Sequence, residues 1–365
     1  MGVGCSNKAT GKFESCVFLL AIRDVFATSC SQTMSAATPR VAHLHFAFTL
    51  ARILVAAAMV AMNAGCGVRH QGAATKPGAS SAVRFVAVPL DSDQAAYSTD
   101  GITWRPAALP SRQYWACVAH GAGKFVALAD STTAAYSLDG IRWIPSPLPI
   151  SARWDSVAYG TGGFLAVAWA SNEAIRSVDG ITWTVVKLPS SDAPTHGWES
   201  VTAGNGLFVA VDGRNQATWS PDGVQWHIQR LPIPALGWIR VSYGNGVFVA
   251  TDGTQAAYSR DGIVWKTAPL GGTGHWHGLT FGNGRFLAVA YARNQVASSH
   301  DGIHWRIDNL PADTPYWSIP AASNGVLVVG PAPGNRAAHS ADGIHWFTTS
   351  LPLSAFWHVA SADKP

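Results

Sequence analysis

The chain is poor in charged residues and in runs of helix-forming residues. Charged side chains make up 13% of its 365 residues, about half the usual share, whereas hydrophobic residues make up 48%. This balance excludes disorder for most of the chain. Glycine (36), proline (21) and tryptophan (16) are abundant, so we expect many short strands joined by tight turns and exclude an all-helical protein.

A strong net charge is also absent. The formal charge is +4, and five basic residues precede Cys66, so the remainder is nearly neutral and has no basic stripe. This argues against nucleic-acid binding. The glycine-rich stretch 160–163 joins strand to strand without a helix that would hold a phosphate. We expect no cofactor, and no Cys-x-x-Cys pair suggests a metal site.

Cysteine is scarce. Cys5, Cys16 and Cys30 lie near the start of the chain, Cys66 follows an apolar run, and only Cys117 remains beyond it. A disulfide framework is therefore excluded for the main part of the chain. We expect a large domain that is held together by burial alone.

The region before the repeats has the form of an export signal. Arg52 precedes ten apolar residues, 53–62, and Ala64-Gly65-Cys66 follows. Ten residues are too few to span a bilayer, which needs about 20. The ending resembles the lipobox of bacterial lipoproteins, in which the cysteine is lipidated, although Asn63 departs from that pattern. We expect an outer-membrane or periplasmic lipoprotein anchored at Cys66, with a plainly secreted protein and a retained signal anchor as alternatives.

This interpretation divides the N-terminal region into three parts. A signal that starts at Met34 has ordinary proportions, so residues 34–66 form the signal peptide and residues 1–33 are interpreted as a mis-annotated extension. Gly2 and Ser6 also satisfy a myristoylation pattern, which conflicts with an internal export signal. Residues 67–81 are small and polar, as in a flexible linker.

A pattern repeats seven times in residues 82–365. It contains Ser-x-Asp-Gly-(Ile/Val)-x-Trp, and its aspartates are spaced 39 to 43 residues apart. These are Asp100, Asp139, Asp179, Asp222, Asp261, Asp301 and Asp342. A second set of tryptophans each opens a short strand: Trp115, Trp154, Trp198, Trp238, Trp276, Trp317 and Trp357. A period of this length is typical of propellers and solenoids.

Each period contains four short apolar stretches. Residues 238–269 read as the strands WIRVSY, VFVAT, AAYS and IVWKTAP, separated by turn residues such as Asn245-Gly246. The first copy lacks the first of these strands, and the chain ends on FWHVAS, a first strand with no successors. We therefore predict an all-β fold, a seven-bladed β-propeller of four-stranded antiparallel blades, closed by the C-terminal strand joining the N-terminal blade.

The repeated turn resembles the Asp-box, or BNR repeat, of sialidases, sortilin-type receptors and photosystem II assembly factors. That family's pattern is Ser-x-Asp-x-Gly-x-Thr-Trp. Here the residue between Asp and Gly is missing in every copy, as in Ser98, Asp100, Gly101 and Trp104. The resemblance covers residues 82–362 and implies that the seven aspartates staple turns away from the ligand face.

The same resemblance raises the alternative of a sialidase-like glycoside hydrolase. That family implies three substrate-binding arginines, a Tyr-Glu pair and an acidic aspartate on six blades. This chain has seven repeats, and only Glu173 and Glu199 follow Cys66 as glutamates. Asp155 and Glu199 directly follow the strand-opening tryptophans of neighbouring repeats, so they are the candidate catalytic carboxylates. We expect them to be salt-bridged or too widely splayed for catalysis.

The loops opposite the Asp-box turns are expected to form the ligand face around a central funnel. Residues there that we predict to bind a ligand are Arg153, Trp169, Glu173, His196, His275, His277, Tyr316 and His358. The alternative is that these positions are polar because the funnel holds water. The favoured function is a monomeric, non-catalytic binding or assembly scaffold in the cell envelope, whose partner is a protein or a glycan.

Overall fold

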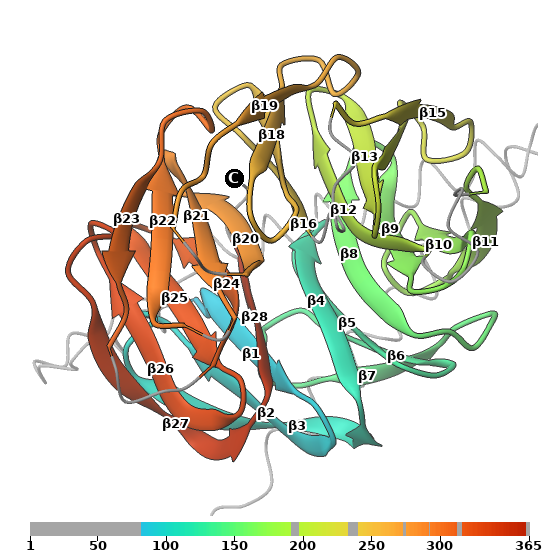
Figure 1. Cartoon of the computed structure of the whole chain (residues 1–365). Coiled ribbons are helices and arrows are strands. Elements are labelled where there is room, and N and C mark those ends of the chain that lie inside the picture. The colour runs from blue at the N-terminus through green and yellow to red at the C-terminus, as the bar shows by residue number, and fades with distance from the viewer. Residues whose placement is uncertain are drawn as a thin grey trace, which may run out of the picture. The chain divides into compact units, whose positions relative to one another are not determined.

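The protein forms seven four-stranded antiparallel sheets arranged as blades around a central axis, which confirms the predicted β-propeller (Figure 1). The computed structural model describes residues 82–190, 197–232, 240–272, 275–291, 293–311 and 316–362. The interpretations of residues 1–33, 34–66 and 67–81, including lipidation at Cys66, lie outside the described residues. Within the described ranges, no helix is long and apolar enough to cross a bilayer.

In each blade, strands A to D run from the axis to the rim. Blade 1 consists of β28 (Trp357–Ser361), β1 (Phe85–Pro89), β2 (Ser92–Ser98) and β3 (Trp104–Gln113). Blade 2 consists of β4 (Trp115–Gly121), β5 (Lys124–Ala129), β6 (Thr133–Ser137) and β7 (Ile144–Pro147). Blade 3 consists of β8 (Trp154–Gly160), β9 (Gly163–Ala168), β10 (Glu173–Ser177) and β11 (Thr184–Lys187).

The remaining four blades have the same order. Blade 4 consists of β12 (Trp198–Gly204), β13 (Leu207–Asp212), β14 (Gln216–Ser220) and β15 (His227–Arg230). Blade 5 consists of β16 (Arg240–Gly244), β17 (Val247–Thr251), β18 (Ala256–Ser259) and β19 (Lys266–Ala268). Blade 6 consists of β20 (Trp276–Gly282), β21 (Arg285–Ala290), β22 (Gln295–Ser299) and β23 (Arg306–Asn309), and blade 7 of β24 (Trp317–Ser323), β25 (Val326–Pro331), β26 (Gly334–Ser340) and β27 (Phe347–Ala355).

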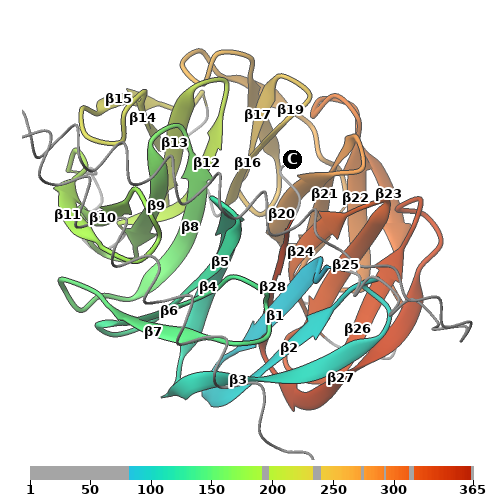
Figure 2. The same cartoon turned by 180° about the vertical axis from the view of Figure 1, so that it is seen from behind.

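The ring closes as the sequence predicts. Strand β28 pairs antiparallel with β1, from Phe85 opposite Ser361 to Pro89 opposite Trp357. Two further backbone bonds extend this pairing: Ala362 N donates to Arg84 O and Leu90 N to Phe356 O. The two ends of the described chain therefore complete one blade, seen side by side in both views (Figures 1 and 2).

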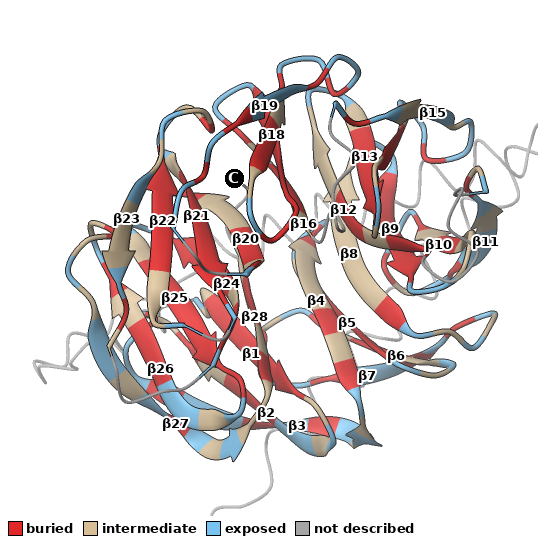
Figure 3. Cartoon of the chain, in the orientation of Figure 1, coloured by how far each residue is buried: buried red, intermediate tan, exposed pale blue. Residues whose placement is uncertain are grey.

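The core lies between neighbouring blades. Six strand-A tryptophans are almost fully buried, namely Trp115, Trp154, Trp198, Trp276, Trp317 and Trp357. Trp115 of blade 2 packs in one cluster with Val86 and Val88 of blade 1, so each blade is covered by the next. Burial is concentrated in the middle strands, whereas exposed residues gather on outer strands such as β3 and β27 (Figure 3). Stability therefore depends on contacts between blades.

Close approach of the A strands requires small residues near their ends. A Cβ placed on Gly244 in β16 would lie 1.9 Å from Cγ of Phe281 in β20. Such a distance is incompatible with any side chain unless the ring moves. Glycine at this position therefore lets an aromatic ring of the next blade pack directly on the backbone.

The Asp-box residues organise the C–D turns through hydrogen bonds to the backbone. In blade 5, Oδ1 of Asp261 accepts hydrogen bonds from Ile263 N at 2.9 Å, Val264 N at 2.8 Å and Ser259 Oγ at 2.9 Å. The same three bonds occur in the other six turns. Gly262 follows with φ +74°, a conformation that favours glycine.

The propeller has two different faces. Asn245 Nδ2 in the A–B turn of blade 5 donates to Gly284 O in the next A–B turn and to His300 O beside an Asp-box, each at 3.1 Å. The A–B and C–D turns thus share one face, which we call the turn face. The B–C loops and the D–A connections form the opposite face, which we call the mouth face.

Candidate functional site

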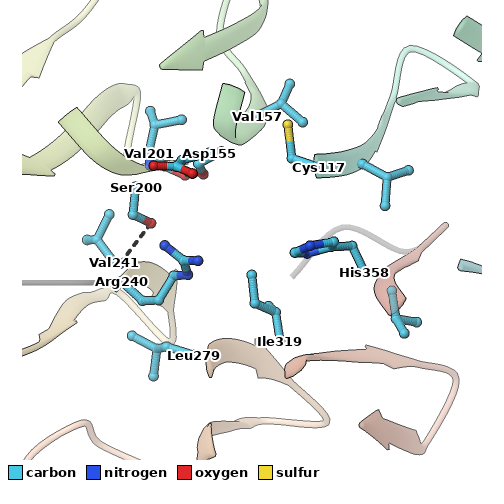
Figure 4. Close-up of a pocket in the computed structure, with 13 residues that line it drawn as sticks. Cys117, Asp155, Val157, Ser200, Val201, Arg240, Val241, Leu279, Ile319 and His358 are labelled. Carbon is cyan, nitrogen blue, oxygen red and sulfur yellow. Dashed lines mark hydrogen bonds between the residues drawn. The ribbon is translucent and has the colours of Figure 1, made fainter. Parts of the chain in front are cut away.

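The A strands surround a cavity of about 130 Å³ on the propeller axis (Figure 4). Part of its wall comes from residues three positions after the strand-A tryptophan in five blades, which are Val118, Val157, Val201, Val241 and Leu279. Residues two positions after the tryptophans also line it, namely Cys117, Ser156, Ser200, Arg240, Ile319 and Val359. Asp155 and His358, which directly follow their tryptophans, complete the lining. The cavity therefore combines an apolar wall with a few charged or ionisable groups.

A bulge in the A strands allows consecutive residues to face this cavity. The pairing of β8 with β9 shifts between Trp154 and Ser156, and the same shift occurs in β4, β12 and β20, while in β24 the shift lies between Trp317 and Pro320. Such a bulge leaves one residue outside the regular alternation of a strand. Asp155 and Ser156 can therefore both line the cavity, although they are neighbours in sequence.

Arg240 supplies the positive charge of the cavity. Its guanidinium enters from β16 and faces His358 across the space (Figure 4). Nη1 donates to the backbone carbonyl of Glu199 at 3.4 Å, and the next residue, Val241, donates its N–H to Ser200 Oγ at 3.1 Å. Burial lowers the pKa of Arg240, while the nearby Asp155 and Glu199 carboxylates raise it again. The Arg240 side chain thus lies near carboxylates from two other blades, Asp155 of blade 3 and Glu199 of blade 4.

Asp155 is paired with arginine. Of the two arrangements expected from the sequence, a salt bridge or a wide separation of the two carboxylates, Asp155 has the salt bridge. Arg153 Nε lies 3.8 Å from Asp155 Oδ1, and the Arg153 guanidinium carbon lies 4.8 Å from the centre of the Trp169 ring. Burial raises the pKa of Asp155, and Arg240 and Arg153 counteract that rise. Arg153 therefore links a buried carboxylate to a half-exposed aromatic ring by an ion pair and a cation–π contact.

Glu199 occupies the equivalent position in blade 4, outside the residues that line the cavity. Its pKa is raised to about 7, mainly by burial and also by Asp155 and Asp212, against the opposing effect of Arg240 and Arg153. Asp130, at the end of strand B in blade 2, has a pKa raised to about 6 by burial and by Asp155. Glu199 on blade 4 and Asp130 on blade 2 therefore keep their protons at higher pH than ordinary carboxyl groups do.

The opposite side of the mouth carries aromatic and histidine side chains. The rings of His277 and Tyr291 lie 5.4 Å apart, and those of Tyr291 and Tyr316 lie 5.0 Å apart. Burial, together with the nearby Arg240, lowers the pKa of His277 to about 3 and that of His358 to about 4. Both histidines are therefore neutral at physiological pH.

The structure does not bring all the predicted binding residues together. Glu173 begins β10, the third strand from the axis, opposite Lys187 of β11. His275 is exposed at the mouth, where its carbonyl accepts the Tyr291 N–H at 2.9 Å. His196 and Trp238 lie outside the described residues. Of the residues predicted from the sequence, those that the structure places around the axis are Arg153, Asp155, Trp169, His277, Tyr316 and His358.

Sequence reasoning missed Arg240, Tyr291 and Asp130. The sequence does distinguish Arg240, which stands two residues after a strand-A tryptophan. At this position the other repeats have only small or apolar residues, namely Cys117, Ser156, Ser200, Gly278, Ile319 and Val359. Tyr291 and Asp130 follow strand B directly, as Trp169 does. Comparing the copies position by position would have selected all three.

No arrangement of three or more His, Cys, Asp or Glu side chains suited to a metal ion occurs in the described ranges. His300 and His304 stand four residues apart on the turn face, but Nδ1 of His300 lies 3.0 Å from Gly284 O and Nδ1 of His304 lies 2.7 Å from Asp301 Oδ2. These contacts show that both histidines take part in interactions of the turn face.

Comparison with known proteins supports the fold and not a family. No protein-family model matches the chain, and no curated protein matches its sequence. The structure is similar to virginiamycin B lyase from Staphylococcus aureus, with 14% identity, a TM-score of 0.60, and coverage of 74% of this chain and 89% of that chain. It is also similar to YCF48 bound to a D1 peptide, with 15% identity, a TM-score of 0.51, and coverage of 73% and 85%.

A third similar structure is AztD from Citrobacter koseri, with 10% identity, a TM-score of 0.50, and coverage of 77% of this chain and 98% of that chain. At these identities the likeness shows the fold alone. Membership of the Asp-box family has no support from these comparisons, so the resemblance rests on the turn motif itself.

Proposed function

We propose that the chain is an exported, lipid-anchored propeller that binds a partner in the cell envelope at its mouth face, without catalysis. One observation carries this proposal: Trp169, Tyr291 and Tyr316 are 36 to 38% exposed and lie beside the charged axis of the propeller. Aromatic rings and arginine are enriched at the energetic centres of binding surfaces. Arg153, stacked on Trp169, adds such an arginine.

Pairing of the carboxylates favours binding over hydrolysis. Asp155 lies beside both Arg153 and Arg240, and Glu199 lies beside Arg240. Arg153 and Arg240 partly offset the rise that burial causes in the pKa of both carboxyl groups, and the ion pair with Arg153 engages Asp155. The partner is a protein or a glycan, and YCF48, which shares this fold, binds a D1 peptide.

The binding proposal is tested by removing the exposed rings. Envelope fractions would be passed over the immobilised full-length protein and over the double variant Trp169→Ala/Tyr316→Ala. Phe347→Ala is the matched control, because Phe347 is an aromatic residue 62% exposed on the outer strand β27. We expect a partner retained by the wild type and by Phe347→Ala to be lost from the double variant. Equal retention by all three proteins would contradict the proposal.

The proposed export and lipid anchoring have a separate test. Mass spectrometry of membrane fractions should find a lipid-modified peptide that begins at Cys66, and Cys66→Ala should release the protein or block its processing. An unmodified N-terminus elsewhere would support plain secretion, and an intact apolar segment would support a retained anchor. A myristoyl group on Gly2 would overturn the export interpretation.

The raised pKa of Glu199, to about 7, favours a second candidate function. A carboxyl group that keeps its proton near neutral pH, close to a second carboxylate, is a feature of glycoside hydrolases. Hydrolysis of aryl glycosides by the full-length protein, lost in both Asp155→Ala and Glu199→Ala, would establish this alternative. We expect these substitutions to change partner retention more than any hydrolysis.

A further inference from the structure

A second hollow lies on the mouth face, above blade 1. Its volume is about 570 Å³, within the range of about 300 to 1,000 Å³ typical of ligand sites. We call it the blade 1 groove. Its apolar lining includes Leu90, Tyr114, Leu353 and Phe356.

The groove exists because blade 1 and its neighbour depart from the other blades. Strands β1 and β2 are joined by only two residues, Leu90 and Asp91, and Asp91 has φ +58°. Because this B–C loop is so short, it does not cover the blade. Strands β3 and β27 have ten and nine residues, whereas the other D strands have three or four. The far ends of both extended strands pair again beyond a break in the ladder, with Ser92 opposite Gln113 and Gly334 opposite Ala355.

The apolar surface in the groove is accessible. Tyr114 is 53% exposed, and Leu90, Leu353 and Phe356 are partly exposed. Leu90 and Phe356 are held in place by the bond from Leu90 N to Phe356 O at 2.9 Å. A fixed and partly exposed group of large side chains is suited to binding an apolar group.

The charges of the groove are unequal. Arg112 forms two bonds with Asp91, from Nε to Oδ1 at 3.0 Å and from Nη2 to Oδ2 at 2.9 Å. Asp93 is exposed in the same lining, so two carboxylates face one guanidinium. The groove therefore has one excess negative charge beside its apolar surface.

We propose that the blade 1 groove binds an extended peptide segment in which a lysine or arginine adjoins a bulky apolar residue. The apolar side chain lies between Leu353, Phe356 and Tyr114, and the cation lies by Asp93. Trp169 and Tyr316 of the proposed partner site are not among the residues that line the groove.

Random-peptide phage display against the immobilised full-length protein tests the proposal, followed by fluorescence anisotropy with the most enriched peptide. We expect enrichment of Lys or Arg next to Leu, Ile or Phe. Asp93→Lys should weaken binding of the selected peptide at least about fivefold at low salt, as for loss and reversal of an exposed ion pair. Leu353→Ser should weaken it comparably.

Controls separate this site from the partner site. Trp169→Ala/Tyr316→Ala should leave binding of the selected peptide unchanged even if it abolishes partner retention, and thermal melting checks that each variant is folded. No enrichment, an acidic consensus, or affinity unaffected by both Asp93→Lys and Leu353→Ser would overturn the proposal. Loss of peptide binding in the Trp169→Ala/Tyr316→Ala variant alone would place the peptide at the axis and also overturn it.

Discussion

At the scale of single residues, Arg240 determines the electrostatics of the propeller axis. It lies beside the Asp155 and Glu199 carboxylates and is the only charged residue at its repeat position. Removing one member of a buried charged group leaves the others uncompensated, which costs about 3–5 kcal/mol when burial is complete. Solvent in the axial cavity reduces this cost.

We predict that Arg240→Met lowers the free energy of unfolding by about 2 kcal/mol near neutral pH. The loss should be smaller at pH 5, because Glu199, whose pKa is raised to about 7, is then protonated and no longer needs a cation. Urea denaturation at the two pH values measures the difference. Arg105→Met, at an exposed position on β3, is the control, and an equal loss in both variants would contradict the assigned role.

Glu199 should make stability depend on pH in a defined direction. Because its pKa is raised from 4.5 to about 7 in the folded state, folding favours the protonated form. Its contribution is complete below about pH 4.5 and is lost as the pH rises through 7. We predict that Glu199→Gln makes the melting temperature less dependent on pH between 5 and 8. An unchanged slope would show that Glu199 is ionised throughout this range.

At the scale of strands, the fit between blades depends on small residues in the A strands. Gly244 leaves room for the Phe281 ring, whereas no atom lies within 4 Å of a Cβ placed on Gly246, whose φ is +75°. The two glycines are two residues apart, and they are glycine for different reasons. One is required by packing and the other by backbone conformation.

This difference gives a matched pair of substitutions. We predict that Gly244→Ala lowers the free energy of unfolding by about 3 kcal/mol, because the ring must move in a packed core. Gly246→Ala should cost about 1 kcal/mol, the usual penalty of a left-handed conformation. Chemical denaturation of both variants tests this, and a larger loss for Gly246→Ala would contradict it.

The elements also show why the fold was predictable and the site was not. Trp115 and Asp100 belong to sets that recur in every blade, so their periodicity identifies strands and turns before any coordinates are known. Arg240 occurs once, and its neighbours Glu199 and Asp155 come from two other blades. The register shift after the strand-A tryptophan in β4, β8, β12, β20 and β24 also disrupts the alternation from which the direction of a side chain would be inferred.

At the scale of the whole molecule, closure by β28 should be essential for folding. Removing residues 354–365 would delete β28 and expose the edge of β1 along its pairing from Phe85 to Pro89. We predict that this truncation abolishes the cooperative thermal transition of the full-length protein, because each blade is stable only through its neighbours. Removing only residues 363–365, beyond β28, is the control. A truncated protein that melts like the full-length chain would contradict the role of closure.

Ring closure also determines the order in which the molecule can be completed during synthesis. Strand β1 leaves the ribosome first, and its inner partner β28 leaves last. At about 5–20 residues per second, the interval is on the order of tens of seconds. During that time the apolar edge Phe85–Pro89 is open to pairing with another nascent chain. The edge of the strand that begins the propeller therefore stays unpaired until the last strand is available.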